Sequence, residues 1–406
     1  MPYQPGEDNV ESHTISLNAT HYNGVKEADV HAFAAMLETY STNKFLTMKN
    51  QRPFIITRST TLGSHKYGFH WTGDNRAEWA YLKGSIADNF NFQLYGIQMV
   101  GPDICGFGGD TNEELCSRWF QLAALYPFAR NHNDHDSISQ EPYALGSTVL
   151  AAAKTGLKFR YSILKYYFTL FVTKKGLGSI FKPIFFAYPG DNNAYVDEIC
   201  DTQFMIGPDL LAAPILEQNS TSRRVYLPES KWYHFHNGQQ YLPGTYSIDN
   251  VSLTDKVPLF LREGTAILVQ DTQFVRQTKD LGNIFQLVAG MKLDNSKSTD
   301  TTKYYHGIAT MLSIKDFNDD SLVTRCISQG CAYVLNFILT TVTDGSKTLE
   351  IDAFYQGVLG LNQLLVIDKV TLYFDGNKVV YQLSNPVQIT GVNKIVVPIY
   401  DKLKEE

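Results

Sequence analysis

The sequence predicts an α/β region followed by an all-β region. Up to about residue 177, short apolar strands, polar loops and helical patterns alternate along the chain. Such repetition is typical of a parallel sheet or barrel. Beyond residue 178 the helical periodicity stops, and short strands alternate with turn residues. At 406 residues the chain is also long enough for two or three domains.

The α/β region contains two predicted strands and four predicted helices. The strands end in polar residues, and in parallel folds such residues gather at the C-terminal edge of the sheet, where chemistry takes place. The second of these helices is expected to be capped at its N-terminus by Asp74 or Asn75. The predicted elements are a helix at 28–48, a strand at 53–57, a helix at 76–86, a strand within 94–107, a helix within 112–128 and a long amphipathic helix at 157–174.

The all-β region is divided at a change in strand length. We assign residues 1–177 to the catalytic layer, 178–270 to a proximal β domain and 271–406 to a distal one. In the distal part, Asp344-Gly345 and Asp375-Gly376 are turn signals, and the second predicts a hairpin between KVTLYF and KVVYQL. Packing against the catalytic layer is the expected role of both β domains, and carbohydrate binding is the alternative.

Charge and hydropathy exclude some classes of partner. The net charge is −6, and no run of like charges suggests nucleic acid or an anionic membrane surface as the main partner. No apolar stretch approaches the roughly eighteen residues of a membrane span. No metal-ligand spacing is evident either. We expect neither a metal nor a cofactor. Three sequons, at Asn18, Asn219 and Asn250, permit secretion and glycosylation.

Five cysteines leave the redox compartment open. Cys105 and Cys116 flank a glycine-rich loop, and Cys326 and Cys331 are five residues apart. Two local disulfides are therefore geometrically possible, and Cys200 would remain unpaired.

Two carboxylates are expected on one edge of the α/β layer. Asp74 follows the first predicted strand after a long loop, and Asp103 ends the second. Taken singly, each has a structural explanation, because Asp is favoured at helix N-caps and in turns. The other four candidates also have structural explanations when taken singly. Arg58 fits a salt bridge and His132 a polar loop, while Trp71 and Phe107 fit core positions. Their occurrence together favours a functional cluster.

Long motifs carry a resemblance to a known family. The segments RPFIITRSTTLGSHKYGFHWTGDN, GIQMVGPDICGFGGDTNEELCSRWFQLAALYPFARNHN and QEPYAL resemble glycoside hydrolase family 31, the α-glucosidase family. The resemblance continues through KPIFFAYPGD, QFMIGPDLLAAPIL, VYLPESKWYHF and VPLFLREGTAIL. Cys116, eleven residues after Cys105, together with RNHN, is similar to the branch that contains lysosomal acid α-glucosidase and sucrase-isomaltase. The implied fold is the C-terminal part of a (β/α)8 TIM barrel followed by two β-sandwich-like domains.

The resemblance implies roles for individual residues. Asp74 in HWTGD matches the family's general acid/base. A retaining glycosidase pairs such a donor, whose pKa must be raised, with an ionised carboxylate roughly 5–5.5 Å away. Cys105 and Cys116, if oxidised, would hold the loop that carries Phe107. The residues that match positions binding the sugar in the cleaved subsite are Arg58, Trp71, Asp103, Phe107 and His132.

The family's nucleophile has no match in this sequence. It is an aspartate in a Trp-Ile-Asp-Met-Asn type of motif, and no such motif occurs in the 406 residues. We therefore expect either a truncated piece of an active enzyme, partnered by the missing N-terminal portion, or a short protein without hydrolytic activity of its own. The expected reaction is release of terminal α-linked glucose from oligosaccharide or from glycogen- or starch-like polysaccharide. The alternative is a non-catalytic protein that binds carbohydrate or a partner. The resemblance implies a lysosomal or secreted location.

Overall fold

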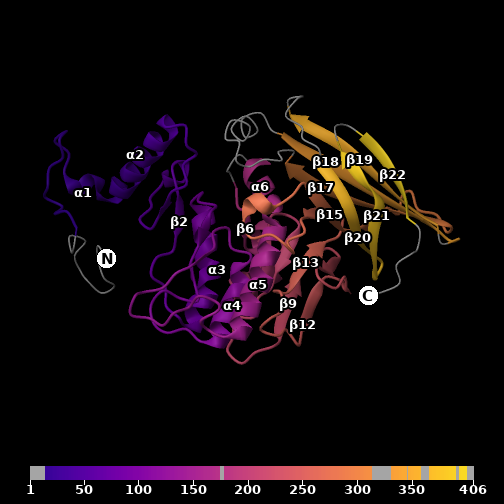
Figure 1. Ribbon diagram of the computed structural model, residues 1–406, viewed down its shortest axis with the longest axis horizontal. Helices are drawn as coiled ribbons and strands as arrows, with labels where there is room; N and C mark the ends of the chain where they lie inside the picture. Colours follow the sequence, from indigo (N-terminus) through magenta and orange to yellow (C-terminus); the bar gives the residue numbers. More distant parts are fainter. Residues whose placement is uncertain are drawn as a thin grey trace. The chain divides into compact units, whose positions relative to one another are not determined.

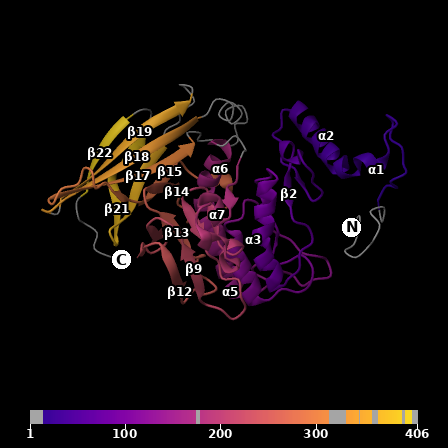
Figure 2. The same cartoon turned by 180° about the vertical axis from the view of Figure 1, so that it is seen from behind.

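The computed structural model describes residues 14–173, 178–312, 331–344, 346–357, 365–389 and 393–399. The chain divides into two compact units, Met1–Trp71 and Thr72–Glu406. Figures 1 and 2 show the elements of each unit in sequence colours. Among the described residues, no helix is both long and apolar enough to cross a membrane.

The described residues of the first unit form helices within 27–48, a short 3-10 turn at Ser64–Lys66 and a pair of short parallel strands. Strand β1 (Ile56–Thr57) pairs with β2 (Phe69–Trp71), with Thr57 opposite His70. The prediction of a long loop between the first strand and Asp74 is wrong, because β2 lies just before that residue. The strand was missed because its alternation is inverted: the buried residue is His70, and the two aromatic neighbours are half-buried. Burial lowers the pKa of His70 to about 4, and the charge of Arg58 contributes.

The second unit begins with helices and short strands. In this part, strands β4 (Asp103–Ile104) and β5 (Arg130–Asn131) pair in parallel. Helix α4 (Glu113–Ala123) is capped by Asn112, whose side chain accepts a hydrogen bond from the backbone N–H of Leu115 at 3.0 Å. Helices α4 and α5 lie side by side (Figure 1).

The long helix expected at 157–174 is two helices, so that prediction is wrong. Helix α5 (Ser147–Ser162) has Ile163 as its C-cap residue, and α6 (Leu164–Thr173) follows. The first turns of α5 were missed because small residues replace the bulky periodic ones there. At Gly156 an added Cβ would lie 2.7 Å from the Phe120 carbonyl oxygen, so the close approach of α5 to α4 requires glycine.

The remaining helices and strands have the following bounds. The helices are α1 (Glu27–Val30), α2 (Ala34–Met48), α3 (Trp79–Leu94), α7 (Ile184–Ala187) and α8 (Asp197–Cys200). The strands are β3 (Val100–Gly101), β6 (Phe181–Lys182), β7 (Phe204–Ile206), β8 (Leu210–Ala212), β9 (Arg223–Leu227), β10 (Trp232–His234), β11 (Gln240–Tyr241), β12 (Gly244–Ile248), β13 (Leu259–Arg262), β14 (Thr265–Val269), β15 (Ile284–Gly290), β16 (Lys292–Leu293), β17 (Thr302–Leu312), β18 (Cys331–Val342), β19 (Lys347–Gly357), β20 (Leu365–Phe374), β21 (Asn377–Ile389) and β22 (Asn393–Ile399).

The β region of the second unit contains two large sheets. One is six-stranded, in the order β11-β10-β13-β8-β7-β6, and a separate ribbon pairs β12 with β9. The other is nine-stranded, in the order β21-β20-β15-β14-β17-β18-β19-β22 with β16 paired to β17 (Figure 1). A single core joins Ile351 of β19 to Ile389 of β21, although these strands are far apart in the sheet order. The sheet therefore curves back on itself, as in a sandwich.

The hairpin predicted at Asp375-Gly376 is confirmed. Strands β20 and β21 are antiparallel with Phe374 opposite Asn377, and both turn residues have positive φ, 44° and 76°. Positive φ at both positions is the geometry of a type I′ turn, which favours Asp-Gly. The turn signal at Asp344-Gly345 includes a residue outside the described ranges. The boundaries at 177 and 270 stay predictions; β14, within 178–270, pairs with β15 and β17 of the larger sheet.

Candidate active site

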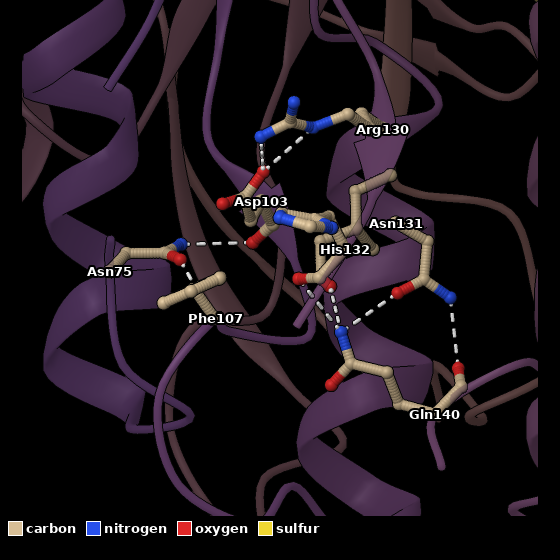
Figure 3. A network of polar contacts seen from close by, with 8 residues as sticks. Asn75, Asp103, Phe107, Arg130, Asn131, His132 and Gln140 are labelled. Atoms are coloured by element: carbon tan, nitrogen blue, oxygen red, sulfur yellow. Dashed lines mark hydrogen bonds and ion pairs between the residues drawn. The ribbon is translucent and has the colours of Figure 1, made fainter. Parts of the chain in front are cut away.

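The centre of the candidate site is Asp103, which is 0% exposed at the start of β4. The Nε and Nη2 atoms of Arg130, its register partner on β5, donate to Oδ1 of Asp103 at 3.0 and 2.5 Å (Figure 3). The other oxygen, Oδ2, is buried and accepts no hydrogen bond from the described part of the chain. Burial raises the pKa of Asp103, and Arg130 opposes that rise. Asp103 thus has one oxygen engaged by Arg130 and one buried oxygen without a donor among the described residues.

Two other predicted site residues lie within electrostatic reach of Asp103. The charge of Asp74 raises the pKa of Asp103, and the charge of His132 lowers it. Asp74 is half-buried, and His132 is exposed in the segment after β5. The structure therefore brings together the two carboxylates that the sequence placed on one edge.

Asn75 connects the segment after Asp74 to the glycine-rich loop. Its Nδ2 donates to the Asp103 carbonyl oxygen at 2.9 Å, and its Oδ1 accepts from the Phe107 backbone N–H at 2.9 Å (Figure 3). The Asn75 carbonyl also accepts from the N–H groups of Phe107 and Gly108. The predicted N-cap role of Asp74 or Asn75 is wrong, because α3 starts at Trp79 with Glu78 as its N-cap residue.

The ring of Phe107 lies beside the imidazole of His132. The ring centroids are 5.3 Å apart with an interplanar angle of 38°. Phe107 is half-buried rather than a core residue. The pair forms an aromatic edge close to Asp103.

Gln140 holds the ends of β4 and β5 together. Its Nε2 lies 2.8 Å from Asn131 Oδ1 and 3.1 Å from the carbonyl oxygens of Ile104 and His132, while Asn131 Nδ2 donates to the Gln140 carbonyl at 2.8 Å (Figure 3). Sequence reasoning gave no role to Gln140, Asn131 or Arg130, although they occur in the motifs QEPYAL and ARNHN. Arg130 and Gln140 lie 27 and 36 positions from their partners Asp103 and Ile104, so local patterns do not show these contacts.

The candidate disulfide between Cys105 and Cys116 is confirmed. Their Cα atoms are 4.6 Å apart, and both residues are 0% exposed. Cys105 has φ 72°, an unfavourable conformation for a residue with a side chain. At the adjacent Gly106 an added Cβ would lie 2.3 Å from the Ala77 backbone nitrogen. Cys200 is free, and Cys326 lies outside the described residues.

Arg58 and Trp71 belong to the first unit. Trp71 ends β2, and Arg58 follows β1 directly. Because Thr57 pairs with His70 in parallel register, both residues lie at the C-terminal end of this strand pair. Their contacts with a sugar stay predictions.

No metal centre is found in the described part of the chain: it contains no group of three or more His, Cys, Asp or Glu side chains placed to hold an ion.

Family models match most of the α/β region and the start of the β region. Residues 4–170 match the TIM-barrel domain of glycosyl hydrolases family 31, and residues 178–267 match the C-terminal domain of that family. The two matched ranges together cover more than half of the chain.

Curated relatives carry the names of α-glycosidases. The chain is 36% identical over 379 residues to lysosomal acid α-glucosidase of Tetrahymena pyriformis, covering 86% of this chain and 40% of that protein. It is 40% identical over 235 residues to the α-glucosidase of Mucor javanicus, covering 57% of this chain and 27% of that protein. It is 33% identical over 345 residues to human intestinal sucrase-isomaltase, covering 84% of this chain and 18% of that protein. The chain therefore spans less than half the length of these relatives.

Solved structures share the fold. A Flavobacterium johnsoniae family 31 dextranase complexed with glucose aligns with TM-score 0.71 and 21% identity, over 93% of this chain and 46% of that one. The glucosidase II α subunit bound to Glc1Man2 aligns with TM-score 0.69 and 23% identity, over 96% of this chain and 43% of that one. The fold is thus part of a TIM barrel followed by β-rich domains, and the chain belongs to glycosyl hydrolase family 31.

Proposed function

We propose that the chain is the acid/base-bearing part of a retaining α-glucosidase. Asp74 is the proton donor, and Asp103 binds a sugar hydroxyl. The single observation that carries the proposal is the buried Asp103 carboxylate, paired with Arg130 through one oxygen only and close to Asp74. A buried carboxylate oxygen without a donor is costly, and a sugar hydroxyl would supply that donor.

The chemistry divides between the two carboxylates. Asp74 gives its proton to the glycosidic oxygen as the bond to the leaving sugar breaks, and it later takes a proton from the attacking water. Asp103, held by Arg130, orients the sugar, while Phe107 and His132 bound the same space. The resemblance adds Arg58 and Trp71 as sugar-binding residues. The aspartate that attacks the anomeric carbon is supplied by a segment of the family pattern that these 406 residues do not contain.

The proposed substrate is a terminal α-linked glucose of an oligosaccharide or a glycogen- or starch-like chain. The support is the α-glucosidase naming of the relatives. We also propose a lysosomal or secreted location. The Tetrahymena relative is named as lysosomal, and the buried Cys105–Cys116 disulfide suits an oxidising compartment.

The test measures maltotriose binding to the purified chain by equilibrium dialysis. Asp103→Asn is expected to weaken one binding site per chain by at least about tenfold, because a hydrogen-bonded charged acceptor is worth about 1.5–3 kcal/mol. Asp136→Asn is the matched control, since that side chain is 83% exposed. Equal binding by the chain and by Asp103→Asn would contradict the proposal.

The same preparations should not hydrolyse an aryl α-glucoside, because the nucleophile is not in the chain. Turnover that Asp74→Asn abolishes would show that this part of the account is wrong.

A further inference from the structure

A cavity lies mainly in the β region of the second unit, away from the Asp103 site. Its volume is about 590 Å³, within the range of small-ligand sites. Its walls are the turn between β10 and β11, the segment 247–258 and Thr155 of α5. The side chains that bear on its chemistry are His234, His236, Gln239, Tyr241, Asp249 and Asp255.

Two neutral imidazoles form one wall. Burial lowers the pKa of His234 to about 4 and that of His236 to about 3, with the nearby charge of Lys256 acting further on His236. At neutral pH neither ring is charged. Each therefore offers one donor and one acceptor rather than an attraction for anions.

The hydrogen bonds of these rings are incomplete. Nε2 of His236 lies 3.2 Å from the Val257 carbonyl oxygen. A carbonyl only accepts, so Nε2 carries the proton and Nδ1 is left as an acceptor. Nδ1 of His234 is buried and has no hydrogen-bond partner within the described ranges. Because Nδ1 of His234 is inaccessible to solvent, the imidazole acceptor left for a ligand hydroxyl group is Nδ1 of His236.

An aromatic side chain completes the lining. Tyr241 is half-buried, and its ring is held by edge contacts with Tyr246 at 4.9 Å and Phe260 at 5.5 Å. An aromatic wall with a few fixed polar groups is typical of sites for small neutral ligands. Asp249 and Asp255 bring two negative charges to the lining and Lys256 brings one positive charge, so the lining has no excess of positive charge to attract an anion. The described residues form no metal-binding group.

Hydrogen bonds from helix α4 hold the wall formed by residues 251–255 in place. Arg118 of α4 is 1% exposed and donates to the carbonyl oxygens of Val251 at 2.9 Å and Ser252 at 3.1 Å. Gln121 donates to the carbonyl oxygens of Ser252 and Asp255 at 2.9 and 2.8 Å. Because this segment is already ordered, a ligand does not have to order it, which favours binding.

We propose that this cavity binds a glucose unit of an α-glucan, as a second carbohydrate site on the chain. The inference rests on the proposed function for the identity of the sugar. A glucan held here would stay tethered while its end is processed. Neutral donors and acceptors beside an aromatic ring match a pyranose, which has many hydroxyl groups and no charge.

The experiment is equilibrium dialysis of the full chain against radiolabelled maltotriose, which gives both affinity and number of sites. Gln239→Trp places an indole at the exposed Gln239 position, and Tyr241→Ala removes the aromatic wall. Each is expected to weaken one site at least tenfold and to leave the Asp103-dependent site unchanged. Tyr95→Ala, at a tyrosine that is 55% exposed on another part of the unit, is the matched control and should bind as the parent chain does.

The outcomes separate this inference from the proposed function. Loss of one site in both cavity variants, with Asp103→Asn affecting another site or none, supports the inference. Parent-like binding by both Gln239→Trp and Tyr241→Ala overturns it, as does the absence of any maltotriose binding. If Asp103→Asn alone removes all binding, the inference fails while the proposed function stands.

Discussion

Replacing Arg118 by alanine should lower the free energy of unfolding by about 3–5 kcal/mol. The guanidinium is buried and donates to the carbonyl oxygens of Ser220, Val251 and Ser252 and to the side chain of Gln121. Without it, the carbonyls of Ser220 and Val251 lose the Arg118 donor, and that of Ser252 keeps only the bond from Gln121. Burial also lowers the pKa of Arg118.

Urea denaturation of the full chain measures the effect. Arg118→Met keeps most of the volume but none of the donors, so a loss of at least about 2 kcal/mol in this variant assigns the effect to the hydrogen bonds. Arg224→Ala is the control, because Arg224 pairs at 3.6 Å with Glu198 and both side chains are largely exposed. It should change stability by no more than about 1 kcal/mol. An Arg118→Met variant as stable as the parent would contradict the stabilising role of these hydrogen bonds.

Removing the Cys105–Cys116 disulfide should cost about 3 kcal/mol. The bond closes a short loop that carries Phe107, and it restrains Cys105 at φ 72°. The variant Cys105→Ala with Cys116→Ala avoids placing unpaired thiols in a fully buried site. Release of the loop should also weaken maltotriose binding at the Asp103 site.

The matched control is Cys200→Ala, since Cys200 is free and half-buried. Thermal unfolding of the two variants should differ clearly, with the control close to the parent. Reduction of the parent chain by dithiothreitol should lower its stability toward that of the double variant. A double variant that unfolds at the same temperature as the parent would rule out a stabilising role for the disulfide.

The sequence predicted those features of the fold that depend on local pattern. Strand-then-helix repetition indicated the parallel α/β layer. Asp375-Gly376 indicated a hairpin, because these residue types adopt the positive φ values that the tight turn has in the structure. Strand β2 was missed since its buried residue is His70. The start of α5 was missed since small residues at a close helix contact leave no apolar period.

The candidate site was predicted in part. The motifs placed Asp74, Asp103, Phe107 and His132 in one region, and the structure brings Asp74 and His132 within electrostatic reach of Asp103. The contacts that fix this region were not predictable. Asn75 looked like a helix cap, but its side chain bonds to Asp103 and Phe107, about thirty positions away. Gln140 likewise acts through the carbonyl oxygens of Ile104 in β4 and of His132, which follows β5.

The central claim is that Asp74 is the proton donor of a family 31 α-glucosidase. The direct measurement uses a chimera in which the 379-residue aligned region of the Tetrahymena α-glucosidase is replaced by that of this chain, so that the host supplies the nucleophile. The folded chimera should hydrolyse maltose. Asp74→Asn in the chimera should lower kcat/KM for maltose by at least about 100-fold.

A second substrate gives the signature of a lost proton donor. The value of kcat/KM for 4-nitrophenyl α-glucoside should fall much less in Asp74→Asn, because that leaving group departs without a proton. Asp136→Asn serves as the control and should match the parent chimera. A folded chimera without activity, or one that hydrolyses maltose equally well with Asp74→Asn, would contradict the claim.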